Sequence, residues 1–281
     1  MRKILAVVVC FHPEPSNLQT LSFNLQQENV PVVWVNNGAP GSLDVLQSQK
    51  AVPIIELGSN LGVAAALNRG FEWAIEHGFE AVISFDQDSC PDVGMVGQLQ
   101  KAWNDTGLQE RHAGAIGPST KDRQSGHDMF TFAPYNWIRN RVLPSENKLY
   151  VVDHLITSGC LIPCHVWQEV GPMTDALFID WIDIEWCARA RLLGYQLTMD
   201  GATKMAHSIG EASKPILWRR FHMHAPLRHY YLLRNALLIA KQSKFALGWR
   251  LHHILYALRI IVASLVLGDQ KGQRLYFAAL G

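Results

Sequence analysis

The order of apolar and polar positions predicts alternating strands and helices in the first part of the chain. Four short runs rich in β-branched residues lie at 4–10, 31–36, 52–57 and 81–85. Continuous apolar runs of this length are typical of strands buried on both faces. Helical patterns lie between them at 15–28 and 62–77, the second with Asn60 as N-cap and Gly78 at its end. This alternation predicts an α/β fold with a mostly parallel sheet of Rossmann type.

The pattern changes after residue 117. Residues 118–150 are polar and predict loops, followed by strands at 151–163, 195–199 and 203–207. A helix is predicted at 183–193, where Gly194 ends it. From residue 225 the pattern is helical and unusually apolar. We therefore expect an α/β domain over 1–224, with halves of about 1–117 and 118–224, and a helical segment over 225–281.

Charge is distributed unevenly along this chain of 281 residues, although its net charge is only +1. Residues 1–200 carry 13 basic and 22 acidic side chains, whereas residues 201–281 carry 12 basic and 2 acidic ones. A basic end on an acidic body predicts an anionic partner, either a membrane face or a nucleic acid. The basic residues interleave with Leu, Ile and Val, which favours a membrane over nucleic acid.

The most hydrophobic stretch, 254–268, is 15 residues long and contains Arg259. A spanning helix needs about 20 apolar residues. We interpret the stretch as lying in or on a membrane surface without crossing it, with a buried core helix as the alternative. The five cysteines are an odd number among apolar neighbours and therefore predict reduced thiols. Cys160, Cys164 and His165 match no zinc spacing, which argues against a metal there.

Two carboxylates, Asp86 and Asp88, directly follow the fourth apolar run. Ligands of parallel sheets bind at the carboxyl ends of the strands. A divalent ion bridging the two carboxylates to a diphosphate would compensate their charge, as Mg²⁺ does in many phosphate sites. The alternative is a strand-end turn with solvated acids.

A second acidic group, Asp180, Asp183 and Glu185, lies among Trp, Ile and Phe residues. The spacing of Asp180 and Asp183 places both on one face of a helix start. Apolar surroundings raise the pKa of a carboxyl group, which suits a general base. The alternative is that Asp180 or Asp183 only caps the helix.

Together these residues resemble family 2 glycosyltransferases of GT-A fold, in particular the bacterial rhamnosyltransferase branch. The resemblance covers nearly the whole chain and rests on eight motifs in order. These motifs lie at 8–13 (VVCFHP), 35–38 (VNNG), 60–70 (NLGVAAALNRG), 85–89 (FDQDS), 157–159 (TSG), 178–187 (FIDWIDIEWC), 207–210 (HSIG) and 226–235 (PLRHYYLLRN).

The resemblance implies an inverting, metal-dependent enzyme that moves a deoxyhexose, most specifically L-rhamnose from dTDP-L-rhamnose. The acceptor would be a lipid-linked glycan, at the anionic cytoplasmic face of the inner membrane. Asp86 and Asp88 would hold Mg²⁺ or Mn²⁺, and Asp183 would deprotonate the acceptor hydroxyl. The resemblance gives further roles to the nucleotide contacts Phe11, Asn36, Asn60 and Gly62, the metal or diphosphate contact His207, and the phosphate clamps Arg228 and Arg234.

The chain departs from the family pattern at two positions, with Asn36 where Asp is usual and Ile182 where many relatives carry Glu. Three alternatives remain open. The donor could be a UDP-sugar. A phosphatase of the haloacid dehalogenase type needs a nucleophilic aspartate at the end of the first strand, which instead ends in Cys10-Phe11-His12. A non-catalytic membrane-binding module would leave Asp86, Asp88 and Asp183 unexplained.

Overall fold

The computed structural model describes residues 3–47, 52–105, 112–122, 126, 128–129, 131–134, 141–145, 148–207, 212–216, 219–223 and 225–281. The chain divides into two compact units. The first comprises Met1–Pro134, Arg139–Phe178 and Ile182–His207, and the second Tyr135–Ile138, Ile179–Trp181 and Ser208–Gly281. The predicted boundary after residue 224 lies within the second unit, and the division near residue 117 stays a prediction.

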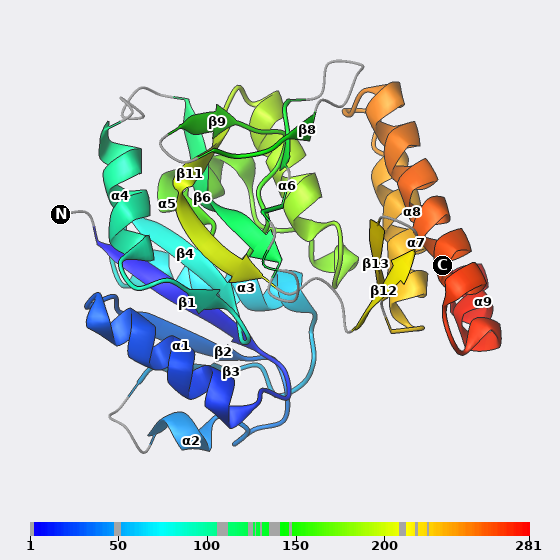
Figure 1. The fold of residues 1–281 in the computed structure, drawn as a ribbon. Coiled ribbons are helices and arrows are strands. Elements are labelled where there is room, and N and C mark those ends of the chain that lie inside the picture. The colour runs from blue at the N-terminus through cyan, green and yellow to red at the C-terminus, as the bar shows by residue number, and fades with distance from the viewer. Residues whose placement is uncertain are drawn as a thin grey trace. The chain divides into compact units, whose positions relative to one another are not determined.

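A mixed sheet forms the centre of the first unit, with the order β3-β2-β1-β4-β10-β6-β11-β5 and with β9 also paired to β11 (Figure 1). The four N-terminal strands run parallel, whereas β10 is antiparallel to both of its neighbours. A separate pair, β7 and β8, lies outside this sheet. The strands are β1 (Ile4–Cys10), β2 (Val32–Asn36), β3 (Ile54–Glu56), β4 (Ala81–Asp86), β5 (Cys90–Pro91), β6 (Ala113–Asp122), β7 (Thr131–Phe132), β8 (Arg141–Val142), β9 (Leu149–Val151), β10 (Leu161–Pro163) and β11 (Gln196–His207).

Helices cover both faces of the sheet, as expected for strands that are apolar throughout. Alternate β1 side chains, Ile4, Ala6 and Val8, pack in one core with apolar side chains of α1 and α4. On the opposite face Val7 meets α3, where a Cβ on Gly70 would lie 2.3 Å from Val7 Cγ1. The helices are α1 (Pro15–Gln27), α2 (Asp44–Gln47), α3 (Val63–Glu76), α4 (Met95–Asp105), α5 (Cys164–Val170), the 3-10 helix η1 (Asp175–Leu177) and α6 (Ile182–Leu192).

The N-terminal half follows the sequence prediction closely, with one correction at the start of α3. Its N-cap is Gly62, with φ +89°, and not Asn60. The Asn60 side chain instead accepts a hydrogen bond from the Gly62 amide just before the helix. The helix ends at Glu76, and Gly78 adopts the positive φ expected of a C-terminal stop.

The middle of the chain departs from the prediction. Residues predicted as loop after 117 continue β6 to Asp122, because β6 pairs with β11 along its length. The predicted strand at 151–163 is two strands, β9 and β10, separated by residues 152–160. The predicted strands at 195–199 and 203–207 form one strand, β11, with an irregularity between Asp200 and Lys204. There the Asp200 carboxylate accepts hydrogen bonds from the Ala202 amide and the Thr203 hydroxyl.

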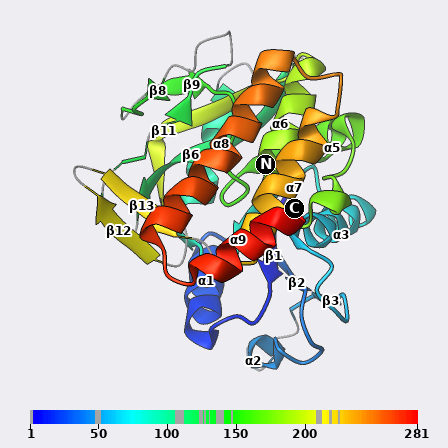
Figure 2. The ribbon, with the colours of Figure 1, turned by 90° about the vertical axis from the view of Figure 1, so that its right-hand side faces the viewer.

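The second unit contains a hairpin of β12 (Ala212–Ile216) and β13 (Arg219–Met223) and three mutually packed helices, α7 (Arg228–Ala240), α8 (Leu247–Leu267) and α9 (Lys271–Leu280) (Figure 2). The helical prediction beyond residue 225 is confirmed. Helix α8 has 21 residues and is longer than the predicted stretch at 254–268. Among the described residues it is long and apolar enough to cross a membrane, by length and composition alone.

Candidate active site

The two carboxylates that follow the fourth apolar run lie at the carboxyl end of β4. Asp86 is half-buried at the last position of the strand and Asp88 is exposed. Between them, the Gln87 side-chain carbonyl accepts a hydrogen bond of 2.6 Å from the Phe11 amide, just after β1. The Ser89 amide donates to the Asp86 carbonyl at 3.0 Å. The turn at 86–89 is therefore fixed to the end of β1, with the Asp88 carboxylate directed into solvent.

A second turn, residues 157–160, packs against this one. The Ser89 and Ser158 hydroxyls are hydrogen-bonded to each other, and both are buried. The Gly159 amide donates to the Ser84 carbonyl at 2.7 Å. Gly159 has φ +78°, and a Cβ there would lie 2.9 Å from the Pro118 ring. This position therefore favours glycine, and the turn is held against the carboxylate pair.

The backbone of β11 also reaches this region. β11 pairs antiparallel to β5, with Met205 opposite Pro91 and Ala206 opposite Cys90. The His207 side chain lies outside the described residues, so its predicted role stays a prediction.

The turn at 86–89 supplies two carboxylates, which are part of the ligand set that a divalent cation needs. Within the described part of the chain, no three His, Cys, Asp or Glu side chains gather as a possible metal site. Two carboxylates at a solvent-open strand end nevertheless match the usual protein share of a Mg²⁺ site, which is completed by water and phosphate oxygens. The residues present therefore fit a metal that arrives with a diphosphate.

Asn36, at the end of β2, is fully buried and uses both ends of its amide. Its Nδ2 donates to the Glu56 carboxylate at 2.7 Å and to the Ala39 carbonyl at 2.9 Å. Its Oδ1 accepts from the Gly38 amide and the Ser42 hydroxyl. Asn36 thus organises the turn after β2, and Glu56 gives a physical reason for an amide where relatives carry Asp.

The neighbouring Asn37 joins this turn to the start of α3. It is buried, its Oδ1 accepts from the Leu61 amide at 2.8 Å, and its Nδ2 donates to Asn60 Oδ1 at 3.1 Å. Asn60 Oδ1 also accepts from the Gly62 amide at 3.0 Å. Sequence reasoning assigned Asn37 no role, although a second polar residue after a buried strand was a signal for one.

Gly62 lies against the segment that leads to the second acidic group. A Cβ at Gly62 would lie 2.6 to 2.8 Å from the Phe178 ring, carbonyl oxygen and Cα. The Val63 amide donates to the Phe178 carbonyl at 2.7 Å. The glycine is thus required for close approach as well as for its positive φ. This contact joins the start of α3 to the chain just before Asp183.

The three carboxylates of the second acidic group have different environments. Glu185 is buried in α6 and pairs with Arg189, four residues on. Asp180 pairs with Arg228 of the second unit. Asp183 is half-buried in the first turn of α6 and accepts a hydrogen bond of 2.8 Å from the Ile184 amide. Asp180 precedes the helix, with φ +63°, so the prediction that it shares a helix face with Asp183 is wrong.

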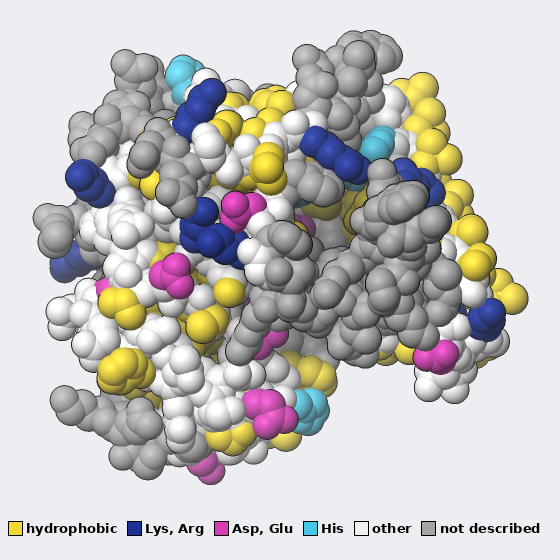
Figure 3. Space-filling view, viewed as in Figure 1, with side chains coloured by type: hydrophobic (Ala, Val, Ile, Leu, Met, Phe, Trp, Pro, Cys, Tyr) yellow, Lys and Arg dark blue, Asp and Glu magenta, His cyan; other side chains and the backbone are white. Residues whose placement is uncertain are grey.

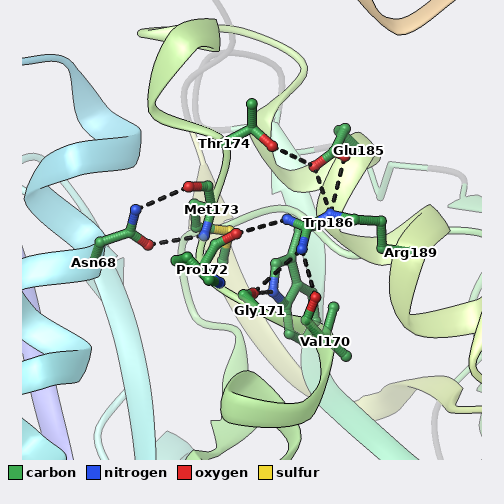
Figure 4. Close-up of polar contacts among 9 residues, drawn as sticks. All are labelled: Asn68, Val170, Gly171, Pro172, Met173, Thr174, Glu185, Trp186 and Arg189. Carbon is green, nitrogen blue, oxygen red and sulfur yellow. Dashed lines mark hydrogen bonds and ion pairs between the residues drawn. The ribbon is translucent and has the colours of Figure 1, made fainter. Parts of the chain in front are cut away.

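The Glu185–Arg189 pair fixes α6 to the turn that follows α5 (Figure 4). Thr174 donates to Glu185, and the Trp186 indole donates to the Gly171 carbonyl. Further hydrogen bonds of the same network join Arg189 to the Val170 and Pro172 carbonyls and Asn68 of α3 to Met173. This network sets the position of α6 on the sheet and with it the position of Asp183.

The charge of Asp183 acts on a thiol of the 157–160 turn. Burial raises the pKa of the Cys160 thiol well above its usual value, and the neighbouring Cys187 and the charge of Asp183 raise it further. Cys160 follows Gly159 in the turn that packs on Ser84 and Ser89. That Asp183 acts together with the carboxylate pair of the 86–89 turn stays a prediction.

The two arginines predicted to clamp phosphate lie in α7. Arg228 makes two hydrogen bonds to the Asp180 carboxylate. Arg234 donates to Asn235 Oδ1 at 3.0 Å and lies over the Tyr230 and Tyr231 rings. Both guanidinium groups therefore have partners within the second unit, and their predicted phosphate contacts stay predictions.

Comparison with known families decides whether the chain is a glycosyltransferase, a phosphatase or a non-catalytic module. Residues 6–168 match the family model of glycosyl transferase family 2. The chain belongs to glycosyltransferase family 2. This membership excludes the phosphatase and the non-catalytic module as descriptions of the chain. The glycosyltransferase is also 31% identical, over 96% of its own length and 90% of the relative, to the dTDP-rhamnosyl transferase RfbF of Shigella flexneri.

Solved structures of low sequence identity share the GT-A fold of this glycosyltransferase. One is GalNAc-T7 with UDP, GalNAc and Mn²⁺, with a TM-score of 0.60 and 12% identity over 94% of this chain and 57% of that one. Another is S. aureus TarS 1-349 in complex with UDP-GlcNAc, with a TM-score of 0.57 and 12% identity over 98% of this chain and 79% of that one. The glycosyltransferase thus spans little more than half of the first of these chains.

Proposed function

We propose that this glycosyltransferase moves an L-rhamnosyl group from dTDP-L-rhamnose to a glycan acceptor, with inversion at the anomeric carbon. The observation that carries the choice of donor is the 31% identity to a dTDP-rhamnosyl transferase along 96% of the chain. The donor side is the edge of the sheet formed by Asp86, Asp88 and the ends of β1 and β2. The UDP-bound relatives of the same fold keep a UDP-sugar donor as the alternative.

In the proposed mechanism the acceptor hydroxyl oxygen bonds to the anomeric carbon as the bond from that carbon to the diphosphate oxygen breaks. Asp183 takes the proton of the hydroxyl, and the diphosphate leaves with the bonding electrons. Asp86 and Asp88 would hold Mg²⁺ or Mn²⁺, which would supply positive charge to the leaving diphosphate. The nucleotide of the donor would bind beside Phe11, Asn60 and Gly62. The turns after β1 and before α3, which carry these residues, are fixed by hydrogen bonds and hold one backbone conformation.

A thermal-shift titration tests donor and metal together. The protein is melted with dTDP, UDP or GDP, each with Mg²⁺, Mn²⁺ or a chelator. A nucleotide at 100 times its dissociation constant stabilises the fold by about 2.7 kcal/mol, which raises the melting temperature by roughly 5–10 °C in a chain of this size. The proposal expects the largest shift with dTDP and metal, and loss of the metal-dependent part in Asp88→Ala.

Each of the other outcomes of that titration would contradict a different part of the proposal. A larger shift with UDP replaces the sugar donor and keeps the transfer reaction. An equal shift in chelator contradicts the metal role of Asp86 and Asp88. If transfer of radiolabelled rhamnose from dTDP-L-rhamnose to membrane glycolipid is also absent, the donor and acceptor assignments both fail.

We further propose that the enzyme works on a lipid-linked acceptor at an anionic cytoplasmic membrane face, where α8 lies along the surface. Exposed apolar side chains recur every three or four residues on α8 and form one face of the helix. We name this face the α8 stripe, which consists of Leu247, Leu251, Leu255, Leu258, Val262 and Val266. Figure 3 displays apolar side chains along the outer edge of this helix.

Burial and charge favour the surface over the core. Only 33% of the apolar window of α8 is buried, although a core helix of a soluble protein is mostly buried. The opposite side of α8 packs on α7 and α9 through side chains such as Trp249 and Ala257. Exposed Lys241, Lys244 and Lys271 flank the stripe, and each near-surface cation adds about 1 kcal/mol of attraction to anionic lipid.

Co-sedimentation with vesicles tests this orientation. Binding to vesicles of phosphatidylglycerol and phosphatidylcholine should fall as salt is raised, and should fall at least tenfold in the double variant Leu255→Ser, Leu258→Ser. The matched control is Leu192→Ser, Leu193→Ser, which removes two exposed leucines from the end of α6 and the residue after it in the first unit. Equal binding to neutral vesicles contradicts the electrostatic part, and equal loss in the control contradicts the role of the stripe.

A further inference from the structure

We propose that α7 positions the general base, by holding residues 179–181 in the conformation that leads into α6. In this assignment Arg228 and Asn235 are positioning residues and not phosphate ligands. The inference rests on the proposed function of Asp183 and names the groups that set its place. It arises from contacts that no sequence motif predicted.

Each of the three residues that precede α6 is held by a polar group of α7. The Arg228 guanidinium donates twice to the Asp180 carboxylate, once from Nε at 3.1 Å. Asn235 Nδ2 donates to the Ile179 carbonyl at 2.8 Å and to the Asp180 carbonyl at 3.2 Å. The Trp181 indole donates to the Leu232 carbonyl at 3.1 Å. Asn235 is fully buried and the Asp180 side chain is only 12% exposed, so these bonds are shielded from water.

The backbone of this segment requires such support. Phe178, Asp180 and Trp181 all have positive φ values, between +62° and +66°. Side chains other than glycine rarely adopt this conformation, which persists where surrounding contacts impose it. Strained positions of this kind are concentrated at functional sites. Here they immediately precede Ile182, the first residue of α6, and Asp183 is the second.

The segment is also fixed at its other end. The Phe178 carbonyl accepts from the Val63 amide, and Phe178 lies against Gly62 at the start of α3. Phe178 is therefore held by the start of α3 within the first unit, and residues 179–181 are held by α7 within the second. The Glu185–Arg189 network holds the body of α6, so we expect loosening of residues 178–181 to displace its first turn, and catalysis by a base is sensitive to misplacement of about 1 Å.

The phosphate-clamp prediction for Arg228 gives a different expectation. A guanidinium that already forms a two-bond pair with a carboxylate that is only 12% exposed has its charge balanced by that carboxylate. Binding phosphate through Nε and Nη2 would require Arg228 to leave Asp180, and the two side chains would then act separately. The two assignments can therefore be separated by comparing Arg228 with Asp180.

The experiment measures kcat and the donor KM for Asp180→Asn, Arg228→Gln and the double variant, in the full chain. The positioning role expects each single variant to lose at least tenfold in kcat with the donor KM within twofold of wild type. The double variant should lose no more than the worse single variant, because both changes remove one pair. Arg228→Lys, which keeps the charge, should recover part of the kcat.

A matched control is Tyr195→Phe, which removes the hydrogen bond of Tyr195 with Glu169 of α5 and lies outside α6. It should lower the melting temperature by a similar amount and leave kcat near wild type. A raised donor KM in Arg228→Gln with Asp180→Asn unaffected would establish the phosphate clamp and overturn the positioning role. Additive losses in the double variant would also overturn it.

Hydrogen exchange separates failure of this inference from failure of the proposed function. In both single variants, amides of a peptide covering 178–184 should exchange at least tenfold faster than in wild type, whereas a peptide from α3 should not change. Unchanged exchange overturns the positioning role even if turnover falls. Faster exchange in a protein that turns over no nucleotide sugar supports the positioning role of α7 and rejects the proposed reaction.

Discussion

The contact between Gly62 and Phe178 can be tested by adding one methyl group. In Gly62→Ala the new Cβ would meet the Phe178 carbonyl oxygen at 2.7 Å and its Cα at 2.8 Å. Both are backbone atoms, in a segment that is itself held at positive φ. The clash therefore cannot be relieved by a side-chain rotation alone, and either the start of α3 or residues 178–181 must move.

Two costs add in this variant. A non-glycine residue at φ +89° costs about 1–2 kcal/mol. Overpacking a close contact costs about 1–3 kcal/mol more. The free energy of unfolding should thus fall by about 2–5 kcal/mol. At roughly 2–4 °C per kcal/mol for a chain of this size, the melting temperature should fall by at least about 4 °C.

Gly58→Ala is the matched control for the conformational cost. Gly58 has φ +76°, and a Cβ there would have nothing within 4 Å. Scanning calorimetry should place its melting temperature between those of wild type and Gly62→Ala, and the difference between the variants measures the contact. If Gly62→Ala melts no lower than Gly58→Ala, the close approach of Phe178 is refuted.

Three further predictions concern single side chains. Asp183→Asn should keep donor binding, measured by calorimetry, and lose at least a hundredfold in kcat; wild-type turnover would reject Asp183 as the base. Asn36→Asp places a carboxylate against that of Glu56 and should lower the melting temperature, and adding Glu56→Gln to this variant should restore it. An unchanged melting temperature in Asn36→Asp would contradict the hydrogen bond between Asn36 and Glu56. Burial raises the pKa of Cys10 from 9.0 to about 12, so the unfolded chain loses this proton first and stability should fall between pH 9 and 12. Urea unfolding midpoints at pH 8 and 10 test this, and Cys10→Ala should reduce the change without removing it, because burial also raises the pKa values of Cys160, Cys164 and Cys187.

The N-terminal half could be predicted because its signals are local. Strand β1 has the predicted bounds, since all of its residues are apolar and buried. Helix α1 differs by one residue at its end, and the carboxylates of the 86–89 turn lie at a strand end as expected. In each case the burial pattern along a few residues determines the element, and a parallel sheet places its strand ends together.

The middle of the chain could not be predicted because its structure depends on distant partners. Strand β10 has three residues and is stabilised by antiparallel pairing to β4 and β6, more than 40 positions away in sequence. The spacing of Asp180 and Asp183 predicts a shared helix face, because spacing alone does not reveal that the chain adopts positive φ before α6. The Ser89–Ser158 hydroxyl contact likewise has no local signal, since it joins residues 69 positions apart.

The departure at Asn36 bears on the turn more than on the choice of nucleotide. An aspartate there could accept from Gly38 and Ser42 but could donate nothing to Glu56 or to the Ala39 carbonyl. A carboxylate buried at position 36 would face the exposed Glu56 carboxylate, and the two like charges would repel each other. An amide at 36 therefore follows from the glutamate at 56. The same reasoning expects family members with Asp at this position to carry a hydrogen-bond donor, or no acid, opposite it on β3.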